Sequence, residues 1–296
     1  MKGIILAGGS GSRLFPITHA TSKQLLPIYN KPLIYYPMSV QMLAGIKEIL
    51  IISTPAHAAS LESLFGDGHE LGLRISYAVQ ARPGGTAEAF LIDEDFIDGD
   101  DVCMMLGDNI FYGDNLAKRL KDARRHVEQT RSAVLFSYYV NNPQDYGVVE
   151  YDRNGNALSI EEKPVNPKSN HVITGLGFYP ADVVEKAKAV KPSPRGELEN
   201  TDILYSYMRQ RRLNIIALGR GDAWLDAGTP EMLLEASNFV RTIERRQGLK
   251  IACLEEIAFN TGLIDEAKLE EHIQKYKNNE YGDYLIKIKE GRGLRL

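Results

Sequence analysis

The chain has 296 residues, of which 44% are hydrophobic and 25% are charged, and its formal net charge is −4. This composition excludes intrinsic disorder and suffices for one large α/β domain or for a domain with a helical extension. The small negative charge argues against binding to nucleic acid or to an acidic membrane surface, so an anionic substrate would need local cations.

The cysteines and the apolar runs indicate the compartment. Cys103 and Cys253 are too few for a disulfide framework or a cysteine zinc site. The apolar run near the N-terminus is too short for a signal peptide, and no later run reaches membrane-spanning length. We therefore expect a cytoplasmic protein with no membrane partner.

Apolar runs alternate with amphipathic segments through the first half of the chain. The apolar runs predict strands at 3–7, 48–53, 74–79, 102–106 and 133–139. Helical spacing predicts helices at 32–44, 58–65, 86–92 and 115–127, the last with Asp114 as its N-cap. This alternation predicts a Rossmann-like, doubly wound α/β fold with a mostly parallel sheet.

The pattern changes near Tyr146. Short β segments between 146 and 178, broken at Asn154-Gly155 and at Lys163-Pro164, predict a β insert with a hairpin. Helices are expected again at 181–189 and 199–211, and the tail from Pro230 is expected to be mostly helical. We predict an α/β core over 1–228, which includes the insert at about 140–200, and a helical C-terminal region over 229–296.

The first predicted strand runs into a glycine-rich loop that ends in a cation, Gly3-Ile-Ile-Leu-Ala-Gly-Gly-Ser-Gly-Ser-Arg13. Glycines let backbone N–H groups approach an anion closely, so Gly8, Gly9 and Gly11 indicate a phosphate-binding loop, to which Arg13 adds charge. Leu14 stands where a dinucleotide-binding fold needs its third glycine, and no Gly-Lys-Ser/Thr closes the loop as in a P-loop. The sequence therefore predicts an anion-binding loop of another kind.

Polar residues follow several of the predicted strands, where parallel sheets bind their ligands. Gln80 follows the third strand, Asp108 follows the fourth, and Asp226 ends a short apolar run, from which it could meet Asp108. Two carboxylates together with phosphate oxygens suit octahedral Mg²⁺. Each residue also has an ordinary structural explanation, because Asp108 is compatible with a turn and lysines such as Lys23 are usually solvated.

Longer motifs are distributed over nearly the whole chain: Gly3 to Arg13, Ser22-Lys-Gln-Leu-Leu-Pro27, Lys31-Pro-Leu-Ile-Tyr-Tyr-Pro37, Gly107-Asp-Asn109, Tyr146-Gly-Val-Val-Glu150, Glu161-Glu-Lys-Pro164, Pro192-Ser-Pro-Arg-Gly-Glu-Leu-Glu199 and Trp224-Leu-Asp226. Together they resemble the motifs of the sugar-phosphate nucleotidyltransferases, and within that family the long, tetrameric glucose-1-phosphate thymidylyltransferases.

The resemblance implies an activity and a set of site residues. A sugar 1-phosphate would attack the α-phosphorus of dTTP in one in-line displacement and release pyrophosphate. The implied nucleotide-binding residues are Leu6, Gly8, Gly9, Gly11, Ser12, Arg13, Gln80 and Gly85, and the implied sugar-phosphate-binding residues are Gly147, Glu162, Lys163, Ile173 and Arg195. The implied catalytic residues are Arg13, Lys23, Asp108, Lys163 and Asp226, of which Asp108 and Asp226 would hold Mg²⁺. The resemblance also implies a homotetramer, in which residues 229–296 would serve packing, assembly and regulation.

Two positions at the expected sugar end depart from the family pattern. Thr86 stands where the family has leucine, and Gly177 stands where it has tyrosine. Either a neighbouring aromatic residue, Phe178 or Tyr179, compensates for the change, or the pocket is roomier and more polar and accepts a hexosamine 1-phosphate.

The expected regulatory site of the long form also differs. It would lie near Gly113, Gly221, Glu256 and Ile257, but Ala117 and Asn260 stand where the family has two further binding side chains. Feedback inhibition by a dTDP-sugar is therefore expected to be lost or directed at a different sugar nucleotide.

Three alternatives stay open at this point. UTP can replace dTTP, since one methyl group of the base is worth only about 1 to 3 kcal/mol. The protein can be a nucleotide-sugar sensor without turnover, which the retained metal carboxylates argue against. A dinucleotide-dependent oxidoreductase is disfavoured because the third glycine is missing and Asp67 lies in a loop.

Overall fold

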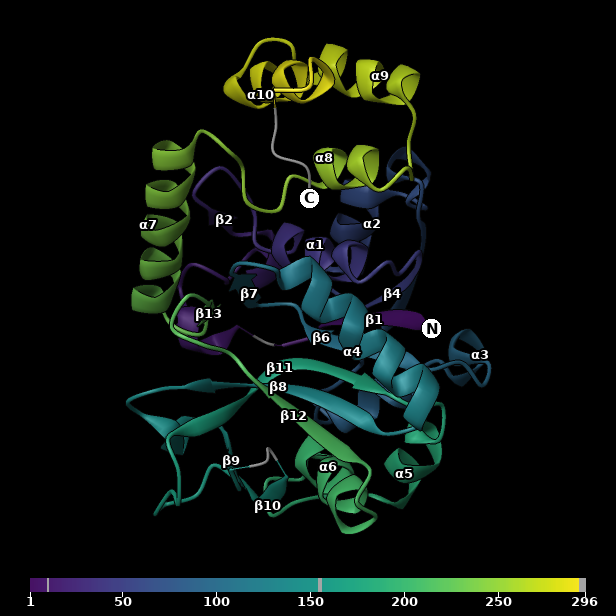
Figure 1. Ribbon diagram of the computed structural model, residues 1–296, viewed down its shortest axis with the longest axis vertical. Coiled ribbons are helices and arrows are strands. Elements are labelled where there is room, and N and C mark those ends of the chain that lie inside the picture. Colours follow the sequence, from purple (N-terminus) through teal and green to yellow (C-terminus); the bar gives the residue numbers. More distant parts are fainter. Residues whose placement is uncertain (10, 154–155, 293–296) are drawn as a thin grey trace.

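The computed structural model describes residues 1–9, 11–153 and 156–292 (Figure 1). Within these residues, a nine-stranded sheet has the order β10-β9-β11-β6-β1-β4-β5, with β8 paired to β11 and β12 paired to β8. Strands β10 and β11 run opposite to the other strands of the sheet, so the expected α/β fold with a mixed, mostly parallel sheet is confirmed. The strands are β1 (Lys2–Ala7), β4 (Glu48–Ser53), β5 (Arg74–Val79), β6 (Val102–Leu106), β8 (Ala133–Tyr139), β9 (Gly147–Tyr151), β10 (Ala157–Glu162), β11 (His171–Tyr179) and β12 (Leu213–Ala217).

Helices cover both faces of this sheet (Figure 1). Alternate residues of the central strands point to opposite faces, so that Ile5 and Ile51 join one hydrophobic core while Ile4 and Leu50 join the other. The first core includes α1 (Tyr35–Leu43), α2 (Ala58–Phe65) and α4 (Leu116–Thr130), and the second includes α5 (Val183–Ala189) and α6 (Asn200–Arg209).

Two short ladders lie beside the main sheet. Strands β2 (Pro27–Ile28) and β3 (Lys31–Pro32) form a hairpin, and β7 (Asn109–Tyr112) pairs antiparallel with β13 (Ala223–Asp226). Strands β7 and β12 were not predicted from the sequence. The β7–β13 ladder matters for the site, because it aligns Asp226 with Asn109, next to Asp108.

The structure corrects three predicted helices. The helix expected at 32–44 begins only at Tyr35, because Pro32 pairs within the β2–β3 hairpin. The segment expected as a helix at 86–92 forms a single 3₁₀ turn, η4 (Ala87–Phe90), whose first backbone N–H donates to the Leu198 carbonyl. Asp114 does not cap α4: Asn115 takes the N-cap position in the left-handed conformation.

The remaining short elements are α3 (Glu94–Ile97), η1 (Ser12–Leu14), η2 (Lys23–Leu25), η3 (His69–Leu71) and η5 (Pro143–Asp145). Strands β9 and β10 pair antiparallel as the β insert requires, but the turn predicted at Asn154-Gly155 lies outside the described residues.

The C-terminal helices are α7 (Pro230–Gln247), α8 (Leu254–Asn260), α9 (Glu266–Tyr276) and α10 (Glu280–Lys289), of which α9 and α10 lie at one end of the molecule in Figure 1. Helix α7 starts where expected because Thr229 accepts a hydrogen bond from the Met232 backbone and Pro230 fits the first turn. Side chains of α8, α9 and α10 join the same core as α1 and α2. The division at residues 228 and 229 stays a prediction. Among the described residues, no helix is long and apolar enough to cross a bilayer.

Candidate active site

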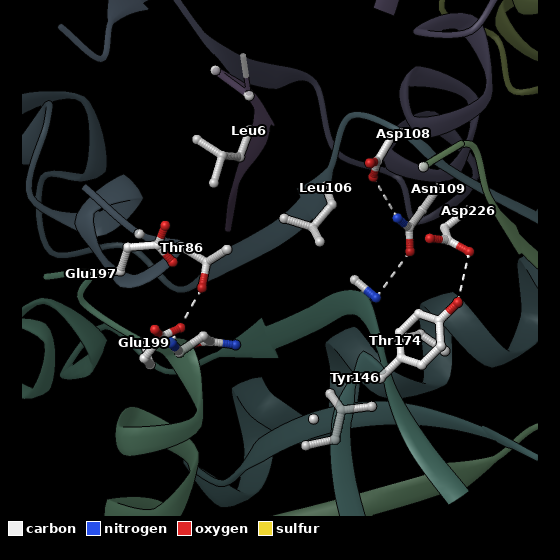
Figure 2. A pocket seen from close by; sticks show the side chains of 18 of the residues that line it. Leu6, Thr86, Leu106, Asp108, Asn109, Tyr146, Thr174, Glu197, Glu199 and Asp226 are labelled. Carbon is white, nitrogen blue, oxygen red and sulfur yellow. Dashed lines mark hydrogen bonds between the residues drawn. The ribbon is translucent and has the colours of Figure 1, made fainter. Parts of the chain in front are cut away.

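A cavity of about 840 Å³ lies at the carboxyl ends of β1 and β6. Every residue that the sequence suggested for nucleotide, sugar-phosphate or metal binding lines it, from Leu6 to Asp226. Figure 2 shows Asp108, Asn109, Tyr146 and Asp226 gathered on one side of the cavity, while Thr86, Glu197 and Glu199 lie on the other. The fold therefore brings together residues that are far apart in the sequence.

The glycine loop forms the wall after β1. Gly11 has φ +63° and precedes the 3₁₀ turn of Arg13, so an L side chain there would be strained. At Gly8 an added Cβ would lie 2.7 Å from Oε1 of Gln80, so the missing side chain lets the Gln80 amide lie against the loop. Nothing lies within 4 Å of a Cβ placed at Gly9, which leaves that backbone open to the cavity.

Gln80 is held by neighbours beside this loop. Its Nε2 atom donates to Oε2 of Glu88 at 2.6 Å and to the Gly85 carbonyl at 3.3 Å. Gly85 itself has φ +98°, and a Cβ there would lie 2.3 Å from the Leu198 carbonyl oxygen. The positive φ of Gly85 and its close approach to Leu198 therefore hold in place the carbonyl that accepts the hydrogen bond from Gln80.

Lys23 is buried, which rules out a solvated surface lysine. It follows Ser22, whose side chain caps η2, and its Nζ atom lies 2.5 Å from Oδ2 of Asp108. Burial alone would raise the pKa of Asp108, but the charge and hydrogen bond of Lys23 hold that pKa below its ordinary value. Asp108 is therefore ionised at neutral pH.

Asn109 was missed as a functional candidate, although it stands in the quoted Gly107-Asp-Asn109 motif. Its Nδ2 atom donates to Oδ1 of Asp108 at 2.7 Å. Its Oδ1 atom accepts from the Trp224 indole at 2.6 Å and from the Gly175 backbone at 3.0 Å. This side chain ties β7, β11 and β13 together and orients the Asp108 carboxylate.

Asp226 lies beside Asp108 through the β7–β13 ladder, and the Ala227 backbone donates to the Asp108 carbonyl at 3.1 Å. Tyr146, another residue that the sequence did not single out, donates its hydroxyl to Oδ1 of Asp226 at 3.1 Å. Burial, and next the negative charge of Asp108, raise the pKa of Asp226. Arg13 lies nearby, because a Cβ at Gly228 would be 3.3 Å from its guanidinium nitrogens.

The two carboxylates have the chemistry of a divalent-cation site. After burial, the negative charge of Asp108 is the next cause that raises the pKa of Asp226, and a bound cation would offset that charge. Among the described residues, no group of three or more His, Cys, Asp or Glu side chains could enclose a metal. A cation held by Asp108 and Asp226 would have only two protein side chains as ligands. Mg²⁺ sites are often of this kind, and phosphate oxygens and water complete them.

The opposite side of the cavity carries mixed charges. Arg195 lies 2.8 Å from Glu199 and 3.4 Å from Glu162, and the Lys163 ammonium lies 3.9 Å from Glu162. Burial, followed by the charge of Glu199, raises the pKa of Glu162. Lys163 has φ +43°, an uncommon conformation for a lysine, which is held by a hydrogen bond from its backbone N–H to the Tyr146 carbonyl.

The residues expected at a regulatory site lie outside this cavity. Gly113 packs against Asp222, since a Cβ there would lie 2.1 Å from its Oδ1 atom. Glu256 is buried in α8 and accepts a hydrogen bond from the Tyr284 hydroxyl at 2.8 Å. Whether Gly221, Ile257, Ala117 and Asn260 take part in regulation stays a prediction.

The sequence profile of the family described as "Nucleotidyl transferase" matches residues 2–243, from β1 into α7. The chain belongs to the nucleotidyl transferase family. The region that matches the family, residues 2–243, includes every residue that lines the cavity and ends before α8.

Known relatives agree with this assignment. The nucleotidyl transferase is 54% identical over 288 residues to the glucose-1-phosphate thymidylyltransferase of Neisseria meningitidis serogroup A, an alignment that covers 97% of this chain and 99% of the relative. A structure described as a glucose-1-phosphate thymidylyltransferase from Bacillus anthracis, in complex with sucrose, superposes with a TM-score of 0.74 at 38% identity over 81% of this chain and 95% of that one. UDP-glucose pyrophosphorylase with UDP-glucose superposes with a TM-score of 0.72 at 25% identity, covering 82% of this chain and 98% of that one. The resemblance inferred from the motifs is confirmed.

Proposed function

We propose that this enzyme transfers a thymidylyl group from dTTP to α-D-glucose 1-phosphate and releases pyrophosphate. The observation that carries the proposal is the meeting of the glycine loop, Arg13, the Lys23–Asp108 pair and Asp226 in one cavity. The high identity to a thymidylyltransferase supports dTTP and glucose 1-phosphate as the substrates.

The chemistry needs no protein nucleophile. A phosphate oxygen of the sugar phosphate forms a bond to the α-phosphorus of dTTP while the bond from that phosphorus to the bridging oxygen breaks, and the electron pair leaves with pyrophosphate. Two anions must be aligned for this in-line displacement, so the protein acts by positioning and by neutralising charge.

We assign the positioning to cations on the two sides of the cavity. The backbone of Gly8 to Gly11 and the guanidinium of Arg13 bind the triphosphate, and Lys23, fixed by Asp108, contributes charge beside the reacting phosphorus. Lys163 and Arg195 bind the phosphate of the incoming sugar, with Gly147, Glu162 and Ile173 around the ring. Mg²⁺ held by Asp108 and Asp226 would neutralise charge on the triphosphate when it is bound.

Base recognition is assigned to Gln80 and the backbone near Gly85. A side-chain amide offers both a donor and an acceptor, which match the edge of thymine or uracil. Because the thymine methyl group adds only about 1 to 3 kcal/mol, slow use of UTP is expected.

The test is pyrophosphate release by the purified enzyme with dTTP, Mg²⁺ and glucose 1-phosphate, with each component omitted in turn. Release should require all three, and the product should be dTDP-glucose. Hydrolysis of dTTP without sugar phosphate, or binding without turnover, would contradict the proposal. Replacing dTTP with UTP, and glucose 1-phosphate with glucosamine 1-phosphate, decides between the alternative substrates.

We also propose a cytoplasmic homotetramer, supported by the resemblance to the long form of the family. Size-exclusion chromatography with light scattering should give about four times the chain mass of 33.1 kDa. A monomer mass at micromolar concentration would contradict it.

A further inference from the structure

A side-chain amide in the wall of the cavity has an acceptor atom without a hydrogen-bond partner among the described residues. Asn200, the first residue of α6, lines the cavity, and its backbone N–H donates to Oγ1 of Thr86 at 3.2 Å. Its Nδ2 atom donates to the Tyr179 hydroxyl at 2.8 Å. Its Oδ1 atom is buried and has no hydrogen-bond partner among the described residues. Buried polar atoms are rarely left unpaired, so this acceptor indicates a missing ligand atom.

Tyr179 forms the other half of the arrangement. Its ring packs edge-on against Phe90, with 5.1 Å between ring centroids, and it is 1% exposed. A Cβ at Gly177 would lie 2.5 Å from the Tyr179 hydroxyl oxygen, so Tyr179 fills the space beside Gly177. The hydroxyl accepts from Asn200, and no acceptor for its own proton is found in the described part of the chain.

The pair offers one neutral acceptor and one neutral donor. The packing of Tyr179 on Phe90 and the bond from Asn200 to Thr86 hold both groups in place before a ligand arrives. A phosphate would use cations, which the cavity supplies at other positions. A hydroxyl or an acylamino group can instead donate to Oδ1 and accept from a tyrosine hydroxyl.

Resting on the proposed function, we propose that Asn200 and Tyr179 form a subsite that hydrogen bonds one donor-bearing substituent of the sugar ring, a hydroxyl or an acylamino group. The subsite decides which sugar 1-phosphate is accepted. A preformed polar pair discriminates against a substrate that lacks the matching group, because the protein atoms then stay unpaired.

The test combines enzyme variants with modified substrates. Asn200→Leu removes the amide at similar volume, and Asn170→Leu, at an asparagine that binds the Val140 carbonyl and does not line the cavity, is the matched control. Initial rates are measured at saturating dTTP with glucose 1-phosphate, each of its monodeoxy analogues and N-acetylglucosamine 1-phosphate.

The wild type should lose about tenfold in kcat/KM on one deoxy analogue or, if the substituent is acylamino, should prefer N-acetylglucosamine 1-phosphate by a similar factor. Asn200→Leu should lose about tenfold on the preferred sugar and lose this discrimination, with the KM for dTTP unchanged within about twofold. Asn170→Leu should keep the wild-type profile. An Asn200→Leu enzyme that ranks all sugars as the wild type does would overturn the subsite, as would an equal rise in the KM for dTTP.

Two further measurements keep the proposal testable. If Asn200→Leu does not fold, Tyr179→Phe removes one hydroxyl and should also lose the discrimination. If the wild type forms no dTDP-sugar, the proposed function fails, and calorimetric titration with glucose 1-phosphate and N-acetylglucosamine 1-phosphate tests the subsite alone. Weaker binding of the preferred sugar phosphate to Asn200→Leu would support it, and equal affinities for both proteins would overturn it.

Discussion

The ammonium group of Lys23 lies 2.5 Å from Oδ2 of Asp108, and the Lys23 side chain is only 8% exposed. The pair joins the segment after β1 to the end of β6 across 85 positions in sequence. Removing one partner of a buried ion pair leaves an uncompensated charge, so each residue depends on the other for its position.

Asp108→Asn is expected to lower kcat by about 10²-fold or more, because it removes a charge that orients Lys23 and contributes to the cation site. Pyrophosphate release and thermal unfolding are measured together. Asp101→Asn, which breaks the ion pair with Arg131 outside the cavity, should keep kcat near the wild-type value. Normal turnover by Asp108→Asn with Mg²⁺ would show that the assigned role is wrong.

Asp226→Asn is expected to lose activity to a similar extent while gaining stability at pH 7. Burial and the charge of Asp108 raise the pKa of Asp226, so the folded state holds this proton more tightly than the unfolded state does. The stability of the wild type therefore falls as pH rises through that pKa, and the neutral amide removes this loss. Urea unfolding at pH 7 and pH 4 measures the effect, and a less stable variant at pH 7 would contradict it.

Gly8→Ala is expected to raise the KM for dTTP by about tenfold, with little change in the KM for the sugar phosphate. The new Cβ would lie 2.7 Å from Oε1 of Gln80 and would displace the amide assigned to the base. Gly221→Ala is the control, because a Cβ there meets nothing within 4 Å. If Gly8→Ala changed the KM for dTTP and the KM for the sugar phosphate equally, the assignment of Gly8 to nucleotide binding would be wrong.

Glu256, which lies outside the cavity, is expected to make the free energy of unfolding depend on pH. Burial raises the pKa of Glu256 to about 7, although the Tyr284 hydroxyl partly offsets this. The contribution of the protonated Glu256 carboxyl to the free energy of unfolding is fully present below about pH 4.5, the ordinary pKa of the group, and is lost as pH rises through about 7, up to roughly 3 kcal/mol. Unfolding by urea between pH 5 and 8 should show a flatter profile for Glu256→Gln, and parallel profiles would refute the assignment.

The sequence predicted those elements whose pattern is local. The apolar runs at 48–53, 74–79, 102–106 and 133–139 became strands with the expected bounds, since burial on both faces requires continuous apolar residues. The segment at 86–92, expected as a helix, forms only one 3₁₀ turn, and the backbone N–H of its first residue, Ala87, donates to the distant Leu198 carbonyl. Local spacing carries no information about such a distant partner.

Some residues of the candidate active site could likewise be predicted from the sequence, and others could not. The glycine loop and the polar strand ends could be found from residue type, because phosphate binding needs glycines and cations in sequence order. Lys23 read alone was compatible with a solvated lysine, and only its burial against Asp108 distinguishes the two cases. Asn109 and Asn200 act through hydrogen bonds to residues on other elements, such as Trp224 and Tyr179, which no motif reveals.

By itself, the sequence determined most of the strands and helices and the identity of the charged groups, because apolar runs and helical spacing are local, and its motifs indicated the family by resemblance. Only the tertiary structure decided that Asp226 lies beside Asp108, that Tyr179 fills the space next to Gly177 and that the Asn200 acceptor is unpaired. These facts depend on how β7 pairs with β13 and how α6 packs on the sheet, and such contacts are set by the free energy of the whole fold and not by neighbours in the chain.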